Sequence, residues 1–343
     1  MLLADSWLRD GALSAWLVPS EFLDVNYGVG VKEYLTAKVN LLHIHRFRLD
    51  DVQFSDALVS SAVVVFAKDT VSKGPVVFSQ GSKLDCPDTV LEVPRKALTP
   101  KIKWGRLFST PRSSYNSARV TFGDLFQIKR GLATGDNKFF ILPCERAWEL
   151  GIPKKFLRPI LPPPRRLPRE IISAKPDGSP DLPECFVLID CKLPQDDIRV
   201  RYPRFWEYLQ TGIKSQVSRG YLASRRRPWY SQENRPAAPF LCTYMGRGRN
   251  GVKPFRFLWN QSKATAHNVY LLLYPKGKLK DILAGNMDVT SKVFEALQQI
   301  DTSSFIGSGR AYGGGLFKME PRELAAIPAD VLIEHPGLEA IDG

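Results

Sequence analysis

Closely spaced prolines constrain this chain more than any other feature. Five of them stand between residues 70 and 118: Pro75, Pro87, Pro94, Pro100 and Pro111. Proline lacks the amide hydrogen and clashes with the preceding helical turn, so a long helix cannot form there. Only short extended pieces such as residues 75–78 fit. The spacing predicts two folded regions, residues 1–70 and 119–343, joined by a linker or crossover over residues 71–118.

The first region has α/β patterning. Helix-like segments at residues 2–9, ending at Gly11, and at Val29–Lys38 alternate with apolar, strand-like runs at Ala12–Val18, Leu41–Phe47 and Ala62–Phe66. The first run is typical of a buried parallel strand, and the Val-rich third run favours burial on both faces of a sheet. An α/β sheet usually has ~5–6 strands, so we expect the chain to open in the middle of a fold and to expose apolar sheet surface around Ala15–Val18 and Val63–Phe66.

The second region mixes strands and helices without a repeat. Strand-like runs occur at Leu125–Lys129, Cys185–Asp190 and Val269–Tyr274, and helix-like segments at Arg204–Gln210 and Val293–Ile300. These runs predict an α+β domain.

Positive charge is concentrated in the second region. The 343 residues carry 48 Lys and Arg against 35 Asp and Glu, a formal charge of +13. Residues 1–118 hold 14 basic and 12 acidic residues, whereas residues 119–343 hold 34 and 23. The second region is therefore the expected binder of a polyanion.

The densest basic stretch runs from Arg219 to Arg256, with nine basic residues and one acidic residue, Glu233. The aromatic residues interleaved with these charges are Tyr221, Trp229, Tyr230, Tyr244 and Phe255. Lys and Arg neutralise phosphates and aromatic rings stack on bases, so the composition favours nucleic acid. The alternative is a solvated basic face whose aromatics belong to the core.

Two glycine-rich segments have both a functional and a structural interpretation. Gly131–Phe140 follows a strand and offers Thr134, Asn137 and Lys138 to phosphates or base edges, or it is a plain hairpin turn. Gly307–Gly315 can present backbone amides and Arg310 to a phosphate, or it is a linker. We expect DNA contacts from Lys129, Arg130, Thr134, Asn137, Lys138, Arg225, Arg226, Arg227, Trp229, Tyr230, Arg247, Arg249 and Arg310.

Cysteines and histidines predict neither a disulfide framework nor a metal site. The five cysteines are Cys86, Cys144, Cys185, Cys191 and Cys242, an odd number with no CxxC pair, which is typical of a reducing, cytoplasmic compartment. His43 and His45 share one face of a strand, but no third ligand is evident. No apolar run reaches the ~18 residues of a membrane span, so we expect no membrane partner.

A nuclease is a further hypothesis. Asp181, Asp190 and Lys192 loosely match the carboxylate and lysine spacing that holds Mg²⁺ in many nucleases. The match is short, and in a chain with 35 acidic residues such spacing often arises by chance.

With these residues in view, the chain resembles the C-terminal part of the gamma-class N6-adenine DNA methyltransferases, the TaqI-type enzymes and related fused restriction–modification proteins. The resemblance lies in Leu8–Leu23, Asp51–Phe66, Phe122–Gly131 with Thr134–Asn137, Tyr202–Leu209, Arg227–Tyr230 and Glu320–Leu324. It covers nearly the whole chain. It implies the C-terminal part of a Rossmann-like sheet over residues 1–70 and a target-recognition domain for double-stranded DNA over residues 119–343.

The resemblance also implies what to expect of chemistry. The family uses S-adenosyl-L-methionine, but its cofactor loop and its Asn-Pro-Pro-Tyr catalytic loop do not occur in these 343 residues. We therefore expect no catalytic, cofactor-binding or metal-binding residue here, no methyl transfer by this chain alone, and a separate N-terminal methyltransferase half as a partner. Phe139 or Phe140 would stack on a flipped adenine, or both belong to the core. A non-catalytic specificity subunit remains the other binding-protein alternative.

Overall fold

A computed structural model describes residues 2–48, 51, 53–54, 59–68, 74–108, 119–247, 253–300, 310–312, 316–336 and 338. The chain forms two compact units. The first unit comprises residues 1–119, 246–254 and 301–319, and the second comprises residues 120–245, 255–300 and 320–343.

The first unit contains a five-stranded sheet in the order β1-β3-β2-β4-β5. Its strands are β1 (Leu13–Pro19), β2 (Asn40–Phe47), β3 (Ser61–Ala67), β4 (Val76–Gly81) and β5 (Thr89–Val93). Its helices are α1 (Leu2–Asp5), α2 (Val29–Ala37) and the short 3-10 helices η1 (Ser20–Leu23), η2 (Asn26–Gly28), η3 (Arg95–Ala97) and η4 (Trp104–Phe108). Neighbouring strands are antiparallel except β2 and β4, which are parallel.

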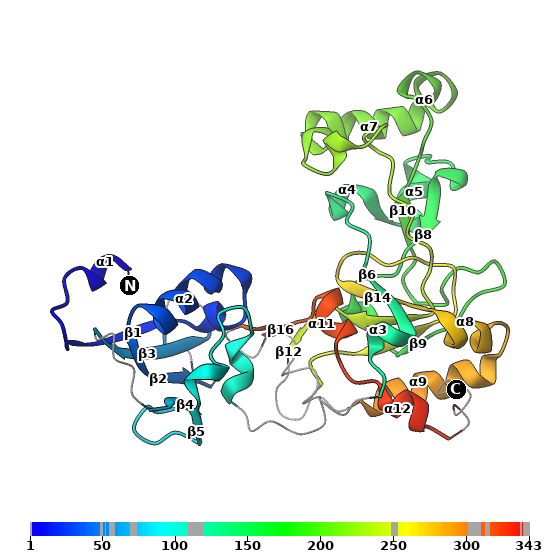
Figure 1. The fold of residues 1–343 in the computed structure, drawn as a ribbon. Helices are drawn as coiled ribbons and strands as arrows, with labels where there is room; N and C mark the ends of the chain where they lie inside the picture. Colours follow the sequence, from blue (N-terminus) through cyan, green and yellow to red (C-terminus); the bar gives the residue numbers. More distant parts are fainter. Residues whose placement is uncertain are drawn as a thin grey trace. The chain divides into compact units, whose positions relative to one another are not determined.

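One face of this sheet is covered. Ile44, Val64, Phe66 and Phe78 are fully or almost fully buried, in one cluster with residues of α2 and η4 such as Trp104. Figure 1 shows α2 along this sheet. Strand residues alternate between faces, and every second residue of β3 therefore enters this core.

The other face, which we call the open sheet face, is apolar and only partly covered. Its apolar residues are Leu13, Ala15 and Leu17 of β1, Val63 and Val65 of β3, Val77 of β4 and Val90 of β5, and the strand register places the polar His43, His45, Ser79 and Glu92 on the same face. His45 and Ser79 are buried, so this face is open mainly at β1 and β5. Leu17 is 44% exposed and Val90 57% exposed. The exposed apolar sheet surface expected from the sequence is therefore present at Ala15 and Leu17. It is absent at residues 63–66, where Val64 and Phe66 are buried and Val63 and Val65 half-buried.

Two expectations for the first unit need correction. The run Ala12–Val18 forms not a buried parallel strand but an antiparallel edge strand, because it pairs with β3 alone and one of its faces is exposed. Residues 71–118 were expected to be a linker, yet β4 and β5 lie inside them and extend the sheet. Pro75, Pro87 and Pro94 precede or follow these short strands, where their missing amide hydrogens cost no sheet hydrogen bonds.

The second unit is built on a five-stranded sheet in the order β6-β14-β11-β13-β9. These strands are β6 (Phe126–Arg130), β14 (Tyr270–Pro275), β11 (Phe240–Thr243), β13 (Phe257–Asn260) and β9 (Ile171–Ile172). The helices that accompany it are α3 (Phe122–Leu125), α8 (Gly277–Leu283), α9 (Met287–Gln299), α11 (Pro321–Ala325) and α12 (Asp330–Glu334). All residues of β11 and β13 are buried, so both faces of this sheet are covered at its centre.

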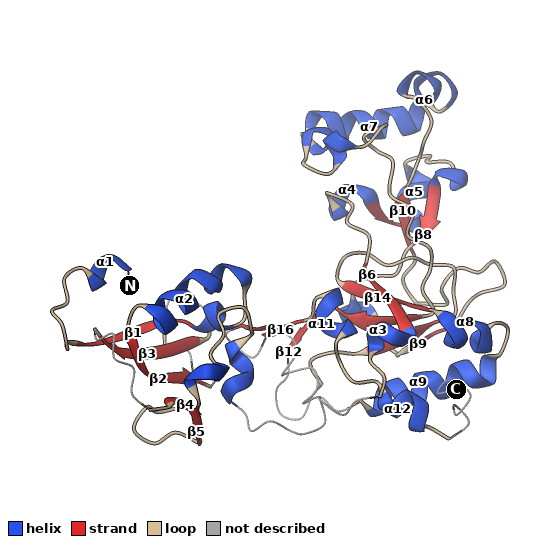
Figure 2. Cartoon of the chain, in the orientation of Figure 1, coloured by secondary structure: helices blue, strands red, loops and turns tan. Residues whose placement is uncertain are grey.

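A smaller lobe of the same unit surrounds the sheet β7-β10-β8. Its strands are β7 (Ile141–Pro143), β10 (Phe186–Ile189) and β8 (Leu157–Pro159), and its helices α4 (Asn137–Phe140), α5 (Cys144–Glu149), α6 (Gln195–Arg201) and α7 (Pro203–Lys214), with the 3-10 helices η6 (Lys154–Phe156), η8 (Val217–Arg219) and η9 (Ala223–Arg225). Figure 2 shows these helices around the small sheet. The 3-10 helix η7 (Pro164–Arg166) belongs to the second unit as well. A fourth sheet, whose residues lie almost entirely in the first unit, has the order β12 (Met245–Arg247), β16 (Leu316–Lys318), β15 (Arg310–Tyr312).

The structure corrects the expectation that no disulfide forms. Cys144 and Cys185 are joined, with Cα atoms 5.4 Å apart. Phe186 lies opposite Pro143 in the antiparallel pair β10 and β7, so the two cysteines flank that pair of strand ends. Spacing in the sequence does not reveal this neighbourhood, whereas Cys86, Cys191 and Cys242 are free thiols.

Candidate nucleic-acid interface

The Gly131–Phe140 turn begins where β6 ends. A side chain at Gly131 would place its Cβ 2.1 Å from the carbonyl oxygen of His267, so only glycine fits. Gly135 has φ +94°, a conformation that L side chains rarely adopt. Asp136 then caps α4 by accepting a hydrogen bond of 3.0 Å from the Phe139 amide. The turn is thus a rigid entry into α4.

Arg226 fastens this turn to the basic segment, which we define as Arg219–Arg227. Its guanidinium donates to the carbonyl oxygens of Thr134 (2.7 Å) and Ala133 (2.6 Å). Burial lowers its pKa, an effect opposed by the carboxylates of Glu233 and Asp190. Thr134 is buried and donates to the Asn137 amide oxygen at 2.6 Å. Arg226 and Thr134 therefore hold the two segments together, and their polar groups are already used within the protein.

The neighbours of Arg226 are exposed instead. Tyr221 is 72% exposed, and the guanidinium carbon of Arg225 lies 3.6 Å from the centre of its ring. Arg227 is exposed and donates to the Ser224 carbonyl oxygen at 2.9 Å. On the adjoining turn Lys138 is exposed as well. This surface offers cationic groups beside a solvent-facing aromatic ring, the two features that contact phosphates and bases.

Four aromatic candidates lie in the core of the smaller lobe. Phe140 and Tyr230 are fully buried, and Phe139 and Trp229 are each 8% exposed. Phe139 stacks on Tyr208 with ring centres 4.7 Å apart, and the Tyr208 hydroxyl donates to the Phe139 carbonyl oxygen at 2.6 Å. Neither phenylalanine presents a free face to a base in this structure. The geometry favours the core interpretation of both, and likewise of Trp229 and Tyr230.

The remaining basic candidates are dispersed. Arg130 is exposed, with its guanidinium 4.0 Å from the centre of the Tyr244 ring and a hydrogen bond to the Asn268 carbonyl oxygen. Lys129 is half-buried on β6, and Arg247 is exposed at the end of β12. Arg310 begins β15. Arg249 lies outside the described residues, as does most of Gly307–Gly315.

The residues of the nuclease hypothesis do not form a metal site. Both carboxylate oxygens of Asp190 accept a hydrogen bond, one from the Arg158 guanidinium at 3.0 Å and the other from the backbone amide of Gln232 at 2.9 Å. Asp181 is exposed on a loop. Among the residues that the structure describes, no group of three His, Cys, Asp or Glu side chains is placed to hold a metal ion. Within the same ranges, no helix is both long and apolar enough to span a membrane.

Sequence reasoning missed two features of this surface. It did not foresee that Arg226 differs from Arg225 and Arg227, since a run of three arginines gives no sign of which one turns inward. It counted Tyr221 among the aromatics without assigning it a contact. The spacing of Tyr221 and Arg225 was an available signal, because residues four apart face each other in a helical turn.

The fold defines the class of protein. The chain is a mixed α/β protein, similar to the type IIL restriction–modification enzyme MmeI, whose structure was solved in complex with DNA. The TM-score is 0.54 at 10% sequence identity, over 92% of this chain and 38% of that one. At this identity the similarity concerns the fold.

The sequence then identifies the family. Residues 111–341 match the family of the type II methyltransferase M.Eco57I, C-terminal domain, and the chain belongs to that family. It is 25% identical over 331 residues to the type II methyltransferase M.AccI of Acinetobacter calcoaceticus, covering 92% of this chain and 58% of the relative. It is 27% identical to M.XamI of Xanthomonas campestris pv. amaranthicola, covering 93% and 57%. The resemblance to the C-terminal part of a methyltransferase is confirmed, and the chain spans less than two thirds of these relatives.

Proposed function

We propose that this chain is the DNA-recognition portion of a site-specific N6-adenine DNA methyltransferase of a cytoplasmic restriction–modification system. The family match over residues 111–341 carries this proposal. The exposed cations of the basic segment and the adjoining turn support it, because they lie inside the matched region and fit a polyanion. Duplex DNA is the partner proposed for the second unit.

We propose no methyl transfer by these residues alone. S-adenosyl-L-methionine is the methyl donor that type II methyltransferase relatives imply. The sequence holds no Asn-Pro-Pro-Tyr, the motif that the resemblance assigns to catalysis. The role proposed for the first unit is to complete the methyltransferase sheet. Its open sheet face, which exposes Leu17 and Val90, would then contact the remainder of the fold.

Salt dependence tests the DNA proposal. We expect duplex DNA binding, followed by fluorescence anisotropy, to weaken steeply as salt rises, since each phosphate contact adds about 0.9 to the slope of log K against log salt. Arg225→Ala with Arg227→Ala should reduce that slope by about 2 and weaken all DNA sequences similarly if both touch phosphate.

A matched control removes the same charge elsewhere. Lys83 and Lys96 are exposed in the first unit, and their double change to alanine also subtracts two positive charges. We expect this control to bind DNA as the parent does. An affinity of the parent chain that does not depend on salt would overturn the proposed function, and equal losses in both double variants would overturn the role of the basic segment.

A further inference from the structure

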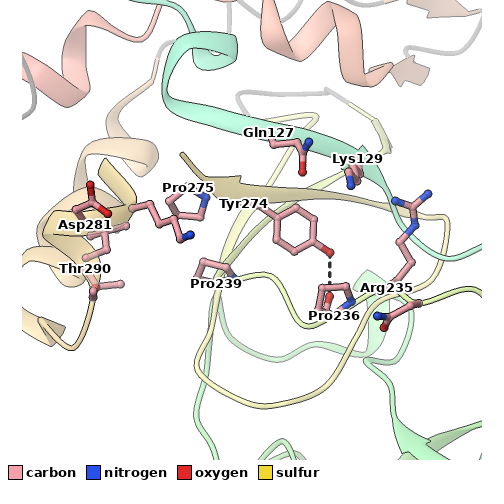
Figure 3. Close-up of a pocket in the computed structure, with 13 residues that line it drawn as sticks. Gln127, Lys129, Arg235, Pro236, Pro239, Tyr274, Pro275, Asp281 and Thr290 are labelled. Carbon is pink, nitrogen blue, oxygen red and sulfur yellow. Dashed lines mark hydrogen bonds between the residues drawn. The ribbon is translucent and has the colours of Figure 1, made fainter. Parts of the chain in front are cut away.

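A cavity of about 610 Å³ lies in the second unit, and no residue of the basic segment lines it. It is bounded by strands β6 and β14, by α8 and by the segment 234–239, as Figure 3 shows. We call it the Tyr274 pocket, because the Tyr274 ring stands at its centre. Gln127 and Lys129 of β6 lie on one side of this ring, with Pro236 and Pro239 on the other. Cavities of roughly 300–1,000 Å³ are the size of small-ligand sites.

The strand pairing explains why polar groups gather there. Gln127 lies directly opposite Tyr274 in the antiparallel pair of β6 and β14. Side chains that are two residues apart in a strand share a face, so Lys129 joins them. The Tyr274 hydroxyl donates to the Pro236 carbonyl oxygen at 2.9 Å, which fixes the ring. Burial raises the pKa of Tyr274, so the hydroxyl remains a donor at neutral pH.

The rim of the pocket is cationic. Lys129, Arg235 and Lys280 line it, against the single carboxylate of Asp281. Arg235 is paired with Glu233 at 2.9 Å. In the described part of the chain, the ammonium groups of Lys129 and Lys280 make no hydrogen bond or ion pair. Two cations therefore line the cavity without internal partners, and such groups can bind a phosphate.

The floor and walls suit a planar, partly apolar group. Pro236, Pro239 and Pro275 present rigid rings around Tyr274. Aromatic rings stack on nucleobases whatever their sequence. The exposed amides of Gln127 and Asn234 supply both donors and acceptors, the groups that recognise base edges. The cavity thus combines a stacking surface, amides for a base edge and cations for a phosphate.

We propose that the Tyr274 pocket binds a nucleotide, with the base against Tyr274 and the phosphate at the cationic rim, where Lys280 contacts it. Two sources share this chemistry: a nucleotide unit of the bound DNA strand and a free nucleotide. The first source rests on the proposed function and would make the pocket a second DNA contact of the same unit. Binding of a free nucleotide in the pocket does not depend on the proposed function.

Two lysines of one helix provide the test. Lys278 and Lys280 are both exposed on α8, and only Lys280 lines the pocket. Lys280→Glu and Lys278→Glu change the net charge equally. Each variant would be compared with the parent chain by anisotropy with duplex DNA and by calorimetry with deoxyadenosine monophosphate.

If a DNA nucleotide occupies the pocket, Lys280→Glu weakens duplex binding about tenfold at 0.1 M salt, the effect of one lost phosphate contact, and Lys278→Glu does not. If a free nucleotide occupies it, duplex binding is the same in both variants, and only Lys280→Glu loses calorimetric binding of the monophosphate. Gln127→Ala gives a second measurement. It should weaken nucleotide binding without changing the slope of log K against log salt, since it removes no charge.

The inference is overturned if Lys278→Glu and Lys280→Glu have equal effects with both probes, whether those effects are large or absent. This failure differs from that of the proposed function. A parent chain that binds no duplex DNA contradicts the DNA-recognition role, while the monophosphate titration still decides for or against the pocket.

Discussion

The two large sheets of this protein are built from similar apolar runs and differ in their cover. In the second unit, every residue of β11 and β13 is buried. In the first unit, β1 alternates between half-buried and exposed residues, and the open sheet face leaves Leu17 44% exposed. Apolar surface stabilises a fold only when folding removes that surface from water. The comparison teaches that the second unit buries the interior strands of its sheet, whereas the edge strand β1 of the first unit leaves apolar side chains in water.

This difference predicts unequal costs of truncating apolar side chains. Phe140 is fully buried in the second unit, with its ring centre 6.0 Å from that of Trp229. Phe140→Ala should reduce the free energy of unfolding by about 3–5 kcal/mol, the cost of a cavity left by a large core residue. Leu17→Ala on the open sheet face should cost less than about 1 kcal/mol. Denaturant unfolding followed by tryptophan fluorescence measures both.

The same pair of variants tests the hypothesis that Phe140 stacks on a base. Stable folding of Phe140→Ala together with weakened DNA binding would contradict the core assignment and return Phe140 to the list of contacts. Equal losses of stability at positions 17 and 140 would contradict the contrast between the two sheets.

Neighbouring arginines sharpen the comparison within the second unit. Arg226→Ala leaves the carbonyl oxygens of Ala133 and Thr134 without their donor. It should therefore destabilise the protein by about 1–3 kcal/mol. Arg225→Ala should change stability by less than about 0.5 kcal/mol, because Arg225 is exposed. Thermal melts of the two variants, with Arg227→Ala as a second exposed control, would measure the contrast. Identical melts in all three would show that Arg226 has no structural role.

The sequence predicted some strands of each unit and missed others, including the fully buried β11 and β13. Leu41–Phe47, Ala62–Phe66 and Cys185–Asp190 correspond to β2, β3 and β10 within a residue or two. A run of apolar residues indicates an element, because it reports what must leave water. It does not indicate the partner strand, which is why Ala12–Val18 was expected to be parallel and buried. Similarly, prolines around β4 and β5 suggested a linker, although they only flank these short strands.

The candidate interface was less predictable than the fold. Composition located the basic segment, since charge counts need no structure. It did not separate Arg226 from Arg225, because the direction of a side chain depends on carbonyl groups more than 90 residues away. The Tyr274 pocket was missed for the same reason, as Gln127 and Tyr274 meet only when β6 pairs with β14.

The open sheet face can be tested without a partner. Leu17→Lys places a charge on this face, and Leu84→Lys is its control, since Leu84 is 43% exposed in a loop of the same unit. We expect Leu17→Lys to lower the fluorescence of a hydrophobic dye and any self-association seen by size-exclusion chromatography, because it puts a charge beside the exposed side chains of Leu13 and Ala15. Leu84→Lys should leave both unchanged. Equal dye fluorescence and equal self-association in the two variants would show that the open sheet face is not the surface responsible for either.

The smallest effect expected is a difference in acid sensitivity between the two units. His43 and His45 lie on β2 of the first unit, and their ring nitrogens lie 2.7 and 2.8 Å from the Ser79 hydroxyl. Burial lowers the pKa of each, and the neighbouring His45 lowers the pKa of His43 further, while the Gly81 backbone and Asp88 act against burial at His45. In the second unit, burial lowers the pKa of His267, and a hydrogen bond with Asn268 acts in the opposite direction.

The sign of the pH dependence follows from these shifts. An unfolded histidine has a pKa of about 6.5, so below that pH the unfolded chain binds protons that the folded chain does not. Stability is therefore full above about pH 6.5 and falls as the pH drops toward the lowered folded values. Two such groups should make the loss steeper in the first unit than one does in the second. Hydrogen exchange of β2 and β3 amides compared with β11 and β13 amides, corrected for intrinsic rates, measures this difference. His43→Gln should reduce it, and an unchanged slope in that variant would show that acid acts on the first unit through other groups.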